Sequence, residues 1–175
     1  QRAHHSLPKA LHLAGIAPQA VRHVPTDALW RIDVAALERQ IEQDRRQGDR
    51  PWLIVGVAGS TDTGAVDDLE ALADLAERHG AWFHVDAAYG GMFRLTARGA
   101  AALRGIERAD SVTVDAHKGL MLPYGVGALL VRRPGALARA HAGSGTYLRD
   151  VPPLEGLPRP LTGLLNKRKR RWHDL

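Results

Sequence analysis

Two ionisable side chains lie at or just after the ends of two expected strands, among small or apolar neighbours, and together they could hold a reactive group. Asp86 closes the segment at residues 82–86, and Lys118 follows the segment at residues 111–115 by three positions. Because a charge is costly to bury among small and apolar neighbours, each of them needs a partner. One possibility is structural: the two form an ion pair, or Asp86 caps its own loop. The other is a bound molecule that a carboxylate and an amine hold together.

The elements around these residues should place both at one edge of a sheet. We expect strands at residues 52–58, 82–86, 111–115 and 126–132, the first of them buried on both faces. A helix that begins with a capping box at Asp67–Glu70, with Leu69, Leu72 and Ala76 on one face, would end at His79-Gly80. A strand, a helix and a second strand form a right-handed unit whose strands are parallel. The sequence therefore predicts an α/β fold that binds ligands at the carboxyl ends of its strands.

Five short motifs, in order and in register, are similar to those of one enzyme family. They are Ala3-His4-His5-Ser6, Ala58-Gly59-Ser60-Thr61, His84-Val85-Asp86-Ala87-Ala88-Tyr89-Gly90-Gly91, Ala116-His117-Lys118 and the segment at residues 123–131. Together they resemble the group II pyridoxal-phosphate-dependent amino acid decarboxylases, which include the aromatic-L-amino-acid, glutamate and diaminobutyrate enzymes. The resemblance implies part of the large domain of the fold-type I pyridoxal-phosphate-dependent transferase fold, with a mostly parallel sheet and one antiparallel strand.

The resemblance also implies a cofactor, pyridoxal 5′-phosphate (PLP), and the residues that bind it. Lys118 would attach PLP covalently, and Asp86 would keep the pyridine nitrogen protonated so that the ring accepts electrons. His4 would stack on the face of the ring, and the small side chain of Ala88 would lie under it. In the alternative interpretation, His4 is an exposed histidine near the N-terminus.

Three further positions have counterparts in the family. Thr61 resembles a threonine near the phenolic oxygen of PLP, although it could equally be an ordinary turn hydroxyl. His117 is similar to the histidine that contacts the cofactor phosphate. Asp115 stands where some relatives have an asparagine near that phosphate, and an ionised carboxylate would repel it. We expect no metal site, because the chain has no cysteine and its remaining histidines lack ligand spacing.

A segment rich in glycine and proline follows at residues 143–158. Within it, residues 145–148 resemble the mobile catalytic loop of the family, whose tyrosine, here Tyr147, would protonate the carbon after CO2 has left. Alternatively, Tyr147 is a surface aromatic in a flexible loop. The expected division is thus part of a PLP-binding large domain (1–142), a mobile catalytic loop (143–158) and a basic tail (159–175).

The charge of the chain is concentrated in that tail. Residues 159–175 hold six basic residues and one acidic residue, whereas residues 1–158 hold 18 of each. A neutral body argues against nucleic-acid binding across a folded face. The tail itself could be a nucleic-acid patch, a disordered end or sequence from outside the family. No apolar run is long enough to span a bilayer, so we expect a cytoplasmic protein.

The predicted function is decarboxylation of a small-molecule substrate, an L-amino acid that is aromatic by preference, to an amine and CO2. A PLP-dependent lyase of the same fold is an alternative, as is a catalytically inactive fragment or an interaction module. We expect a fragment because the family's phosphate-binding loop and C-terminal domain have no counterpart in the chain. The full-length enzyme is expected to be a homodimer.

Overall fold

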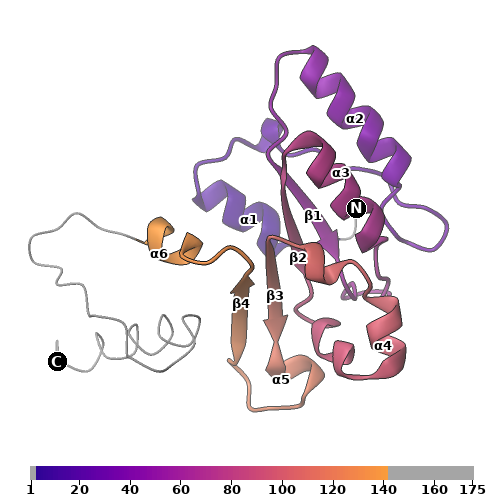
Figure 1. Cartoon of the computed structure of the whole chain (residues 1–175), viewed down its shortest axis with the longest axis vertical. Helices are drawn as coiled ribbons and strands as arrows, with labels where there is room; N and C mark the ends of the chain where they lie inside the picture. The colour runs from indigo at the N-terminus through magenta and orange to yellow at the C-terminus, as the bar shows by residue number, and fades with distance from the viewer. Residues whose placement is uncertain (1–2, 142–175) are drawn as a thin grey trace, which may run out of the picture. The chain divides into compact units, whose positions relative to one another are not determined.

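The computed structural model describes residues 3–141 of the chain (Figure 1). By compactness the chain divides into two units, Gln1–Arg132 and Arg133–Leu175. The first unit contains the sheet and all the candidate site residues except Tyr147. In the second unit the structure describes a short helix, α6 (Ala136–Ala140). Tyr147 and the predicted boundaries at residues 143 and 159 lie outside the described residues.

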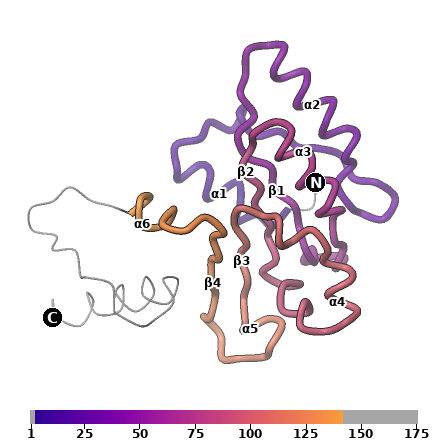
Figure 2. The backbone as a smooth tube through the Cα atoms, viewed as in Figure 1, coloured from indigo at the N-terminus to yellow at the C-terminus, as the bar shows by residue number. Residues whose placement is uncertain are grey.

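The first unit is built on a four-stranded sheet in the order β1-β2-β3-β4. Its strands are β1 (Leu53–Val57), β2 (Trp82–Asp86), β3 (Ser111–Asp115) and β4 (Gly127–Val131). The first three are parallel, and β4 runs antiparallel to β3. The turn that leads from β3 through α5 back into β4 can be followed in Figure 2. The predicted α/β class, with a mostly parallel sheet and one antiparallel strand, is confirmed.

Short helices connect and flank these strands. They are α1 (Ser6–Leu13), η1 (Pro18–Ala20), α2 (Val34–Arg46), α3 (Leu69–His79), η2 (Gly91–Leu95), α4 (Ala97–Ala102), η3 (Ile106–Arg108) and α5 (Ala116–Gly119), where η denotes a 3-10 helix. Helix α3 connects the parallel strands β1 and β2, which is the predicted strand–helix–strand unit. In the described part of the chain, no helix has the length and apolar character that crossing a bilayer requires.

The ends of α3 are set by two residues of the expected type. The carboxylate of Asp68 accepts a hydrogen bond from the backbone nitrogen of Ala71 at 3.1 Å and so caps the N-terminus. At the C-terminus, Gly80 takes the left-handed conformation, with φ of +64°, which costs glycine little. The prediction of a capping box starting at Asp67 is wrong, because the cap lies one residue later.

Asp67 instead joins two distant parts of the backbone. Its side chain is buried and accepts hydrogen bonds from the backbone nitrogens of Ile32, at 2.7 Å, and Val57, at 2.8 Å. Burial raises the pKa of the Asp67 carboxyl, and the two backbone hydrogen bonds partly offset this effect. The carboxylate therefore fixes the loop before α2 to the end of β1.

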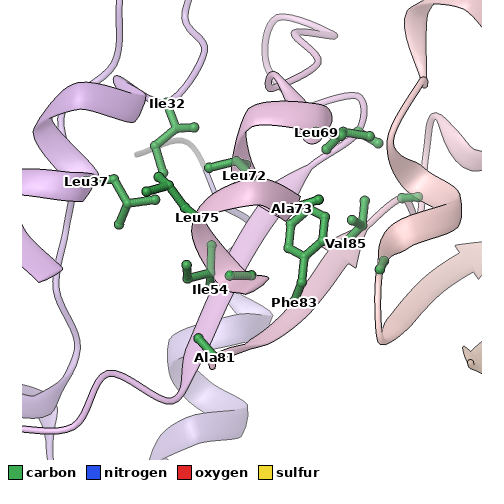
Figure 3. Close-up of a cluster of buried hydrophobic side chains, with 14 of the residues drawn as sticks. Ile32, Leu37, Ile54, Leu69, Leu72, Ala73, Leu75, Ala81, Phe83 and Val85 are labelled. Carbon is green, nitrogen blue, oxygen red and sulfur yellow. The ribbon is translucent and has the colours of Figure 1, made fainter. Parts of the chain in front are cut away.

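The core lies between α3 and one face of the sheet. The buried side chains of Leu72 and Leu75 project from α3 towards Ile54 of β1 and Phe83 of β2 (Figure 3). Burial alternates in the first part of β1, with Ile54 4% exposed and its neighbour Val55 only half-buried, but Gly56 and Val57 are both buried. The prediction that β1 is buried on both faces therefore holds at Val57 and is wrong at Leu53 and Val55, which are half-buried on the face away from α3.

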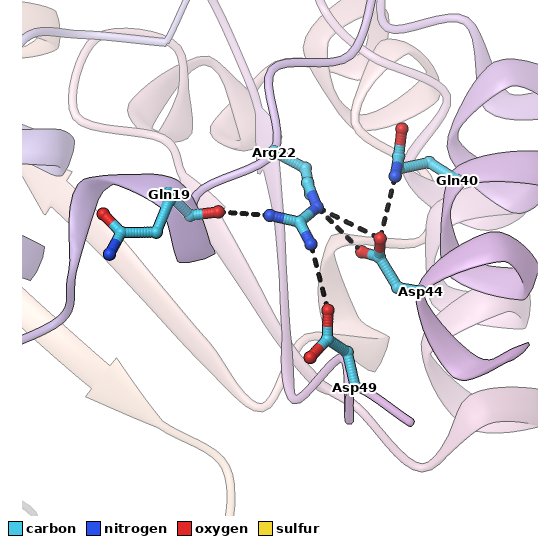
Figure 4. Close-up of polar contacts among 5 residues, drawn as sticks. All are labelled: Gln19, Arg22, Gln40, Asp44 and Asp49. Carbon is cyan, nitrogen blue, oxygen red and sulfur yellow. Dashed lines mark hydrogen bonds and ion pairs between the residues drawn. The ribbon is translucent and has the colours of Figure 1, made fainter. Parts of the chain in front are cut away.

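A polar cluster joins the segment after η1 to helix α2 (Figure 4). The guanidinium of Arg22 donates from Nε to both carboxylate oxygens of Asp44, at 3.1 Å each, and from a terminal nitrogen to Asp49 at 3.1 Å. Gln40 donates to the same Asp44 carboxylate at 2.9 Å, and the carbonyl of Gln19 accepts from Arg22. Asp44 is 6% exposed, so these donors replace the water that its charge loses on burial.

Candidate active site

The parallel strands bring the candidate residues to one edge of the sheet. Asp86 is the last residue of β2, and Asp115 is the last residue of the neighbouring parallel strand β3. Helix α5 begins directly after β3, at its arrowhead in Figure 1, and carries His117 and Lys118. The backbone nitrogen of Asp115 donates to the carbonyl of Ala88 at 3.2 Å, so the loops after β2 and β3 are joined.

The loop after β1 belongs to the same edge. Ala58 donates from its backbone nitrogen to the carbonyl of Asp86 at 2.8 Å, and its own carbonyl accepts from Gly90 at 3.0 Å. A Cβ atom at Gly90 would lie 2.2 Å from the Ala58 carbonyl oxygen, so the backbone can approach this closely only at a glycine. Three successive loops are thereby held together at the carboxyl ends of their strands.

Lys118 is paired with Asp115. Its Nζ lies 2.9 Å from Asp115 Oδ2, with the lysine side chain 39% and the aspartate side chain 18% exposed. Gly127 on β4 leaves room for this carboxylate, since a Cβ there would lie 2.7 Å from Asp115 Oδ1. The structural alternative of an Asp86–Lys118 ion pair is therefore wrong in this structure, and the Asp115 carboxylate faces a cation.

Asp86 caps its own loop, which is the other structural alternative. Its Oδ1 accepts from the backbone nitrogen of Ala88 at 3.2 Å, and no ion pair to Asp86 is found within residues 3–141. The side chain is half-buried. A carboxylate that makes one weak backbone contact can still accept from a ligand. An accessible amine on α5 and such a carboxylate at the end of β2 are groups that could bind an aldehyde and a protonated ring nitrogen, respectively.

His117 is held by the loop that follows α5. Its Nδ1 lies 2.8 Å from the carbonyl oxygen of Val126, which can only accept, so Nδ1 carries the hydrogen. The ring of Tyr124 lies against it at 4.7 Å between centroids. With Nδ1 committed, Nε2 is an acceptor in the neutral ring. His117 could donate from Nε2 to a phosphate only as the doubly protonated cation.

The remaining predicted residues are less constrained. His4 is half-buried, with Nδ1 2.8 Å from the Ser6 hydroxyl and its ring 4.1 Å from that of His5. Thr61 lies exposed in the turn after β1, and Ala88 is half-buried. Among the described residues, no hydrogen bond or ring contact joins His4 or Thr61 to the Asp86 edge.

The sequence motifs indicate no role for a row of polar side chains on the face that carries Asp86. They are Trp82 and His84 on β2 and Ser111 and Thr113 on β3, and hydrogen bonds connect them. Burial lowers the pKa of His84, while the nearby Asp86 carboxylate and the Ser111 backbone act in the opposite direction. The alternation of side chains along a strand could have revealed the row, because His84 is two residues before Asp86.

Known proteins resemble this chain over most of its length. The family described as the pyridoxal-dependent decarboxylase conserved domain matches residues 1–154. An aromatic-L-amino-acid decarboxylase of Bacillus atrophaeus is 40% identical over 149 residues, which is 85% of this chain and 31% of the relative. An aspartate 1-decarboxylase of Aliivibrio fischeri is 44% identical over 134 residues, or 77% of this chain and 24% of the relative.

A solved structure agrees with these matches. The crystal structure of Oryza sativa TDC with PLP and tryptamine has a TM-score of 0.83 and 33% identity, over 93% of this chain and 34% of that one. The chain thus spans about a quarter to a third of the length of these relatives. From the matched domain and these similarities, the chain belongs to the pyridoxal-dependent decarboxylase family.

Proposed function

We propose that the protein decarboxylates an L-amino acid with PLP as cofactor, releasing the amine and CO2. The observation that carries this proposal is the placement of Asp86 and of the α5 residue Lys118 after neighbouring parallel strands, in a chain of the pyridoxal-dependent decarboxylase family. When bound, PLP withdraws electrons from the substrate carbon as CO2 leaves. The residues of this chain hold the cofactor and direct the proton.

Each residue at the edge has a task that fits its surroundings. Lys118 supplies the amine that attaches the cofactor, and Asp115, 2.9 Å away, orients that amine beforehand. Asp86 holds a proton on the pyridine nitrogen. Ala88, two residues after Asp86, has a small side chain, so a flat ring can lie against the loop. His117, fixed by Val126, can bind the phosphate once its Nε2 is protonated.

Three residues complete the proposal on the strength of the family motifs. His4 would stack on the ring, and Thr61 would contact its phenolic oxygen. Tyr147, outside the described residues, would donate the proton that replaces CO2. For His4 and Thr61 to act, the segments that carry them must lie against the edge formed by the loops after β2 and β3.

Lys118 provides the decisive test. The full-length protein is incubated with PLP and reduced with borohydride, and its peptides are mapped by mass. We expect the phosphopyridoxyl group on Lys118 and its loss in a Lys118→Arg variant. Lys9, which is exposed on α1, serves as an internal reference for non-specific labelling. Labelling of other lysines at the level of Lys118, or no labelling, would overturn the proposal.

For the substrate, we propose an aromatic amino acid first. The similarity to the Bacillus aromatic-L-amino-acid decarboxylase, over 85% of the chain, supports this choice. An acidic substrate is the second candidate, favoured by the 44% identity to an aspartate 1-decarboxylase. Amine and CO2 release from tryptophan, phenylalanine, aspartate and cysteine sulfinate distinguish them. Activity restricted to the acidic pair would reject the aromatic preference.

We further propose a cytoplasmic homodimer. Side chains in and after the loop that follows α5 support association, since Met121 and Tyr124 are 92% and 94% exposed and Leu129 of β4 is 49% exposed. Light scattering of the full-length protein should give twice the subunit mass. A monomer at micromolar concentration would contradict the dimer, and recovery in a membrane fraction would contradict the location.

A further inference from the structure

Four side chains form a hydrogen-bonded row that leads along the sheet towards Asp86. The indole Nε1 of Trp82 lies 2.8 Å from the hydroxyl of Ser111, and the same hydroxyl lies 2.8 Å from Nδ1 of His84. Across the ring, His84 Nε2 lies 3.4 Å from the hydroxyl of Thr113. Strand register pairs Ser111 with His84 and Thr113 with Asp86, so the row ends beside that carboxylate.

The first member sets the direction of the row. An indole nitrogen can only donate, so the Ser111 oxygen accepts from Trp82. The serine side chain is almost fully enclosed, at 7% residue exposure, and within residues 3–141 its hydroxyl has these two partners. Its hydrogen therefore goes to Nδ1 of His84, since it would otherwise be buried without an acceptor. A nitrogen that accepts in this way carries no hydrogen of its own.

It follows that the imidazole is neutral and carries its hydrogen on Nε2, which faces Thr113. Two groups act against this state, because the Asp86 carboxylate and the Ser111 backbone both favour an added proton. Burial acts in the other direction and outweighs them, so that the pKa of His84 lies below its ordinary value of 6.5. Geometry and burial thus lead to the same uncharged ring.

An uncharged ring at this place matters for Asp86. A protonated His84, two residues away on the same face, would attract the carboxylate and compete with any ligand cation. We propose that His84 is a positioning residue for Asp86. In this proposal Trp82 and Ser111 hold the imidazole neutral with its hydrogen on Nε2, and the charge of Asp86 is left for the ring nitrogen of the cofactor. The last part of this inference rests on the proposed function, whereas the state of the ring does not.

The state of the ring can be measured without cofactor. The whole chain is labelled with nitrogen-15 in its histidine side chains, and His84 is assigned by the signal lost in a His84→Gln variant. We expect the Nε2-protonated neutral form at neutral pH. Trp82→Phe removes the indole hydrogen and should give a mixture of tautomers. Trp52→Phe, which changes a 55% exposed tryptophan ahead of β1, is the matched control and should have no effect.

Two results would overturn the assignment of the ring. One is a hydrogen on Nδ1, or a doubly protonated ring, in the unmodified protein at neutral pH. The other is an unchanged tautomer in the Trp82→Phe variant. Either result means that hydrogen donation does not run from Trp82 through Ser111 to His84, and the positioning role of His84 then fails.

A second experiment tests the positioning role of His84 by measuring PLP binding through absorbance in the full-length protein. His84→Leu should weaken binding about 10-fold or more, by analogy with residues that orient a ligand-binding group. His84→Gln keeps an amide N–H near Nε2 and should retain most of the affinity. Thr113→Val keeps the shape of the threonine, loses its hydroxyl and should weaken binding less than His84→Leu does. Equal affinities in all variants would overturn the positioning role.

The nitrogen-15 measurement and the PLP-binding measurement together distinguish a failure of the proposed function from a failure of the inference about His84. If the unmodified protein binds no PLP, the proposed function is rejected, and the link from His84 to the cofactor is rejected with it. The nitrogen-15 measurement still decides the state of the ring. If PLP binds normally and the tautomer is wrong, the proposed function survives and the inference about His84 is rejected.

Discussion

The two faces of the sheet differ in what their side chains do. On the face under α3, Ile54 and Phe83 are 4% and 1% exposed and contact apolar neighbours. On the opposite face of the same strands, His84 and Asp86 are half-buried and bonded to polar groups. Adjacent residues of β2 thus belong in turn to the apolar core and to the candidate site. We expect substitutions one position apart to affect different measurements.

The largest effect on stability is expected from Phe83. Phe83→Ala would leave a cavity against α3 and lower the free energy of unfolding by about 3–5 kcal/mol, measured by chemical denaturation. Leu95→Ala, at a leucine that is 77% exposed, is the control and should change it by no more than about 0.5 kcal/mol. Similar losses in both variants would show that the apolar face is not the stabilising one.

On the polar face, Asp86 should give the largest effect on activity. Asp86→Asn keeps an oxygen for the backbone nitrogen of Ala88 but loses the negative charge. Decarboxylation by the full-length protein should therefore fall about 100-fold or more, while the free energy of unfolding changes by less than about 1 kcal/mol. An active variant, or one that loses stability instead, would contradict the division between the faces.

Two substitutions at neighbouring residues of β1 compare the two faces of the sheet directly. Ile54→Thr places a hydroxyl in the core without a partner and should cost about 1–3 kcal/mol more than Val55→Thr, whose hydroxyl stays hydrated on the half-buried face. Chemical denaturation of the two variants measures the difference. Equal costs would mean that both faces of β1 are buried, as its continuous apolar run predicts.

The smallest effect expected is a pH dependence due to His84. Because burial lowers its pKa below 6.5, the unfolded chain binds a proton that the folded chain does not, between the lowered value and 6.5. The free energy of unfolding should therefore fall as the pH is lowered through 6.5. In His84→Gln this part of the slope should disappear, as denaturation at several pH values would show. An identical slope in both proteins would contradict the lowered pKa.

Much of the fold could be predicted because burial leaves a periodic pattern. The sequence pattern predicts β2 and β3 to the residue, and the spacing of leucines with Gly80 predicts α3 and its C-terminal end. The predicted N-cap of α3 is one residue too early, because Asp67 and Asp68 are both residue types that can cap a helix. Only the three-dimensional structure shows that Asp67 is used by the backbone of Ile32, 35 residues away.

The site was predictable where it depends on strand ends and less so where it depends on side-chain partners. The position of Asp86 at the carboxyl edge follows from the strand pattern. The pairing of Lys118 with Asp115 is a contact across one helical turn, at a spacing of three, and the sequence could have indicated it. No sequence pattern indicates that Trp82 donates to Ser111, because their side chains meet through strand register alone.

The two backbone hydrogen bonds that Asp67 accepts restrict which residue types can replace it. The backbone N–H groups of Ile32 and Val57 donate to different oxygens of this carboxylate. Asparagine offers one oxygen and would set an N–H against the other donor, and glutamate would push the group one carbon further into a filled space. An acidic side chain of this length is therefore the natural choice, even though burial disfavours its charge. Relatives that lose it should show compensating changes near Ile32 or Val57.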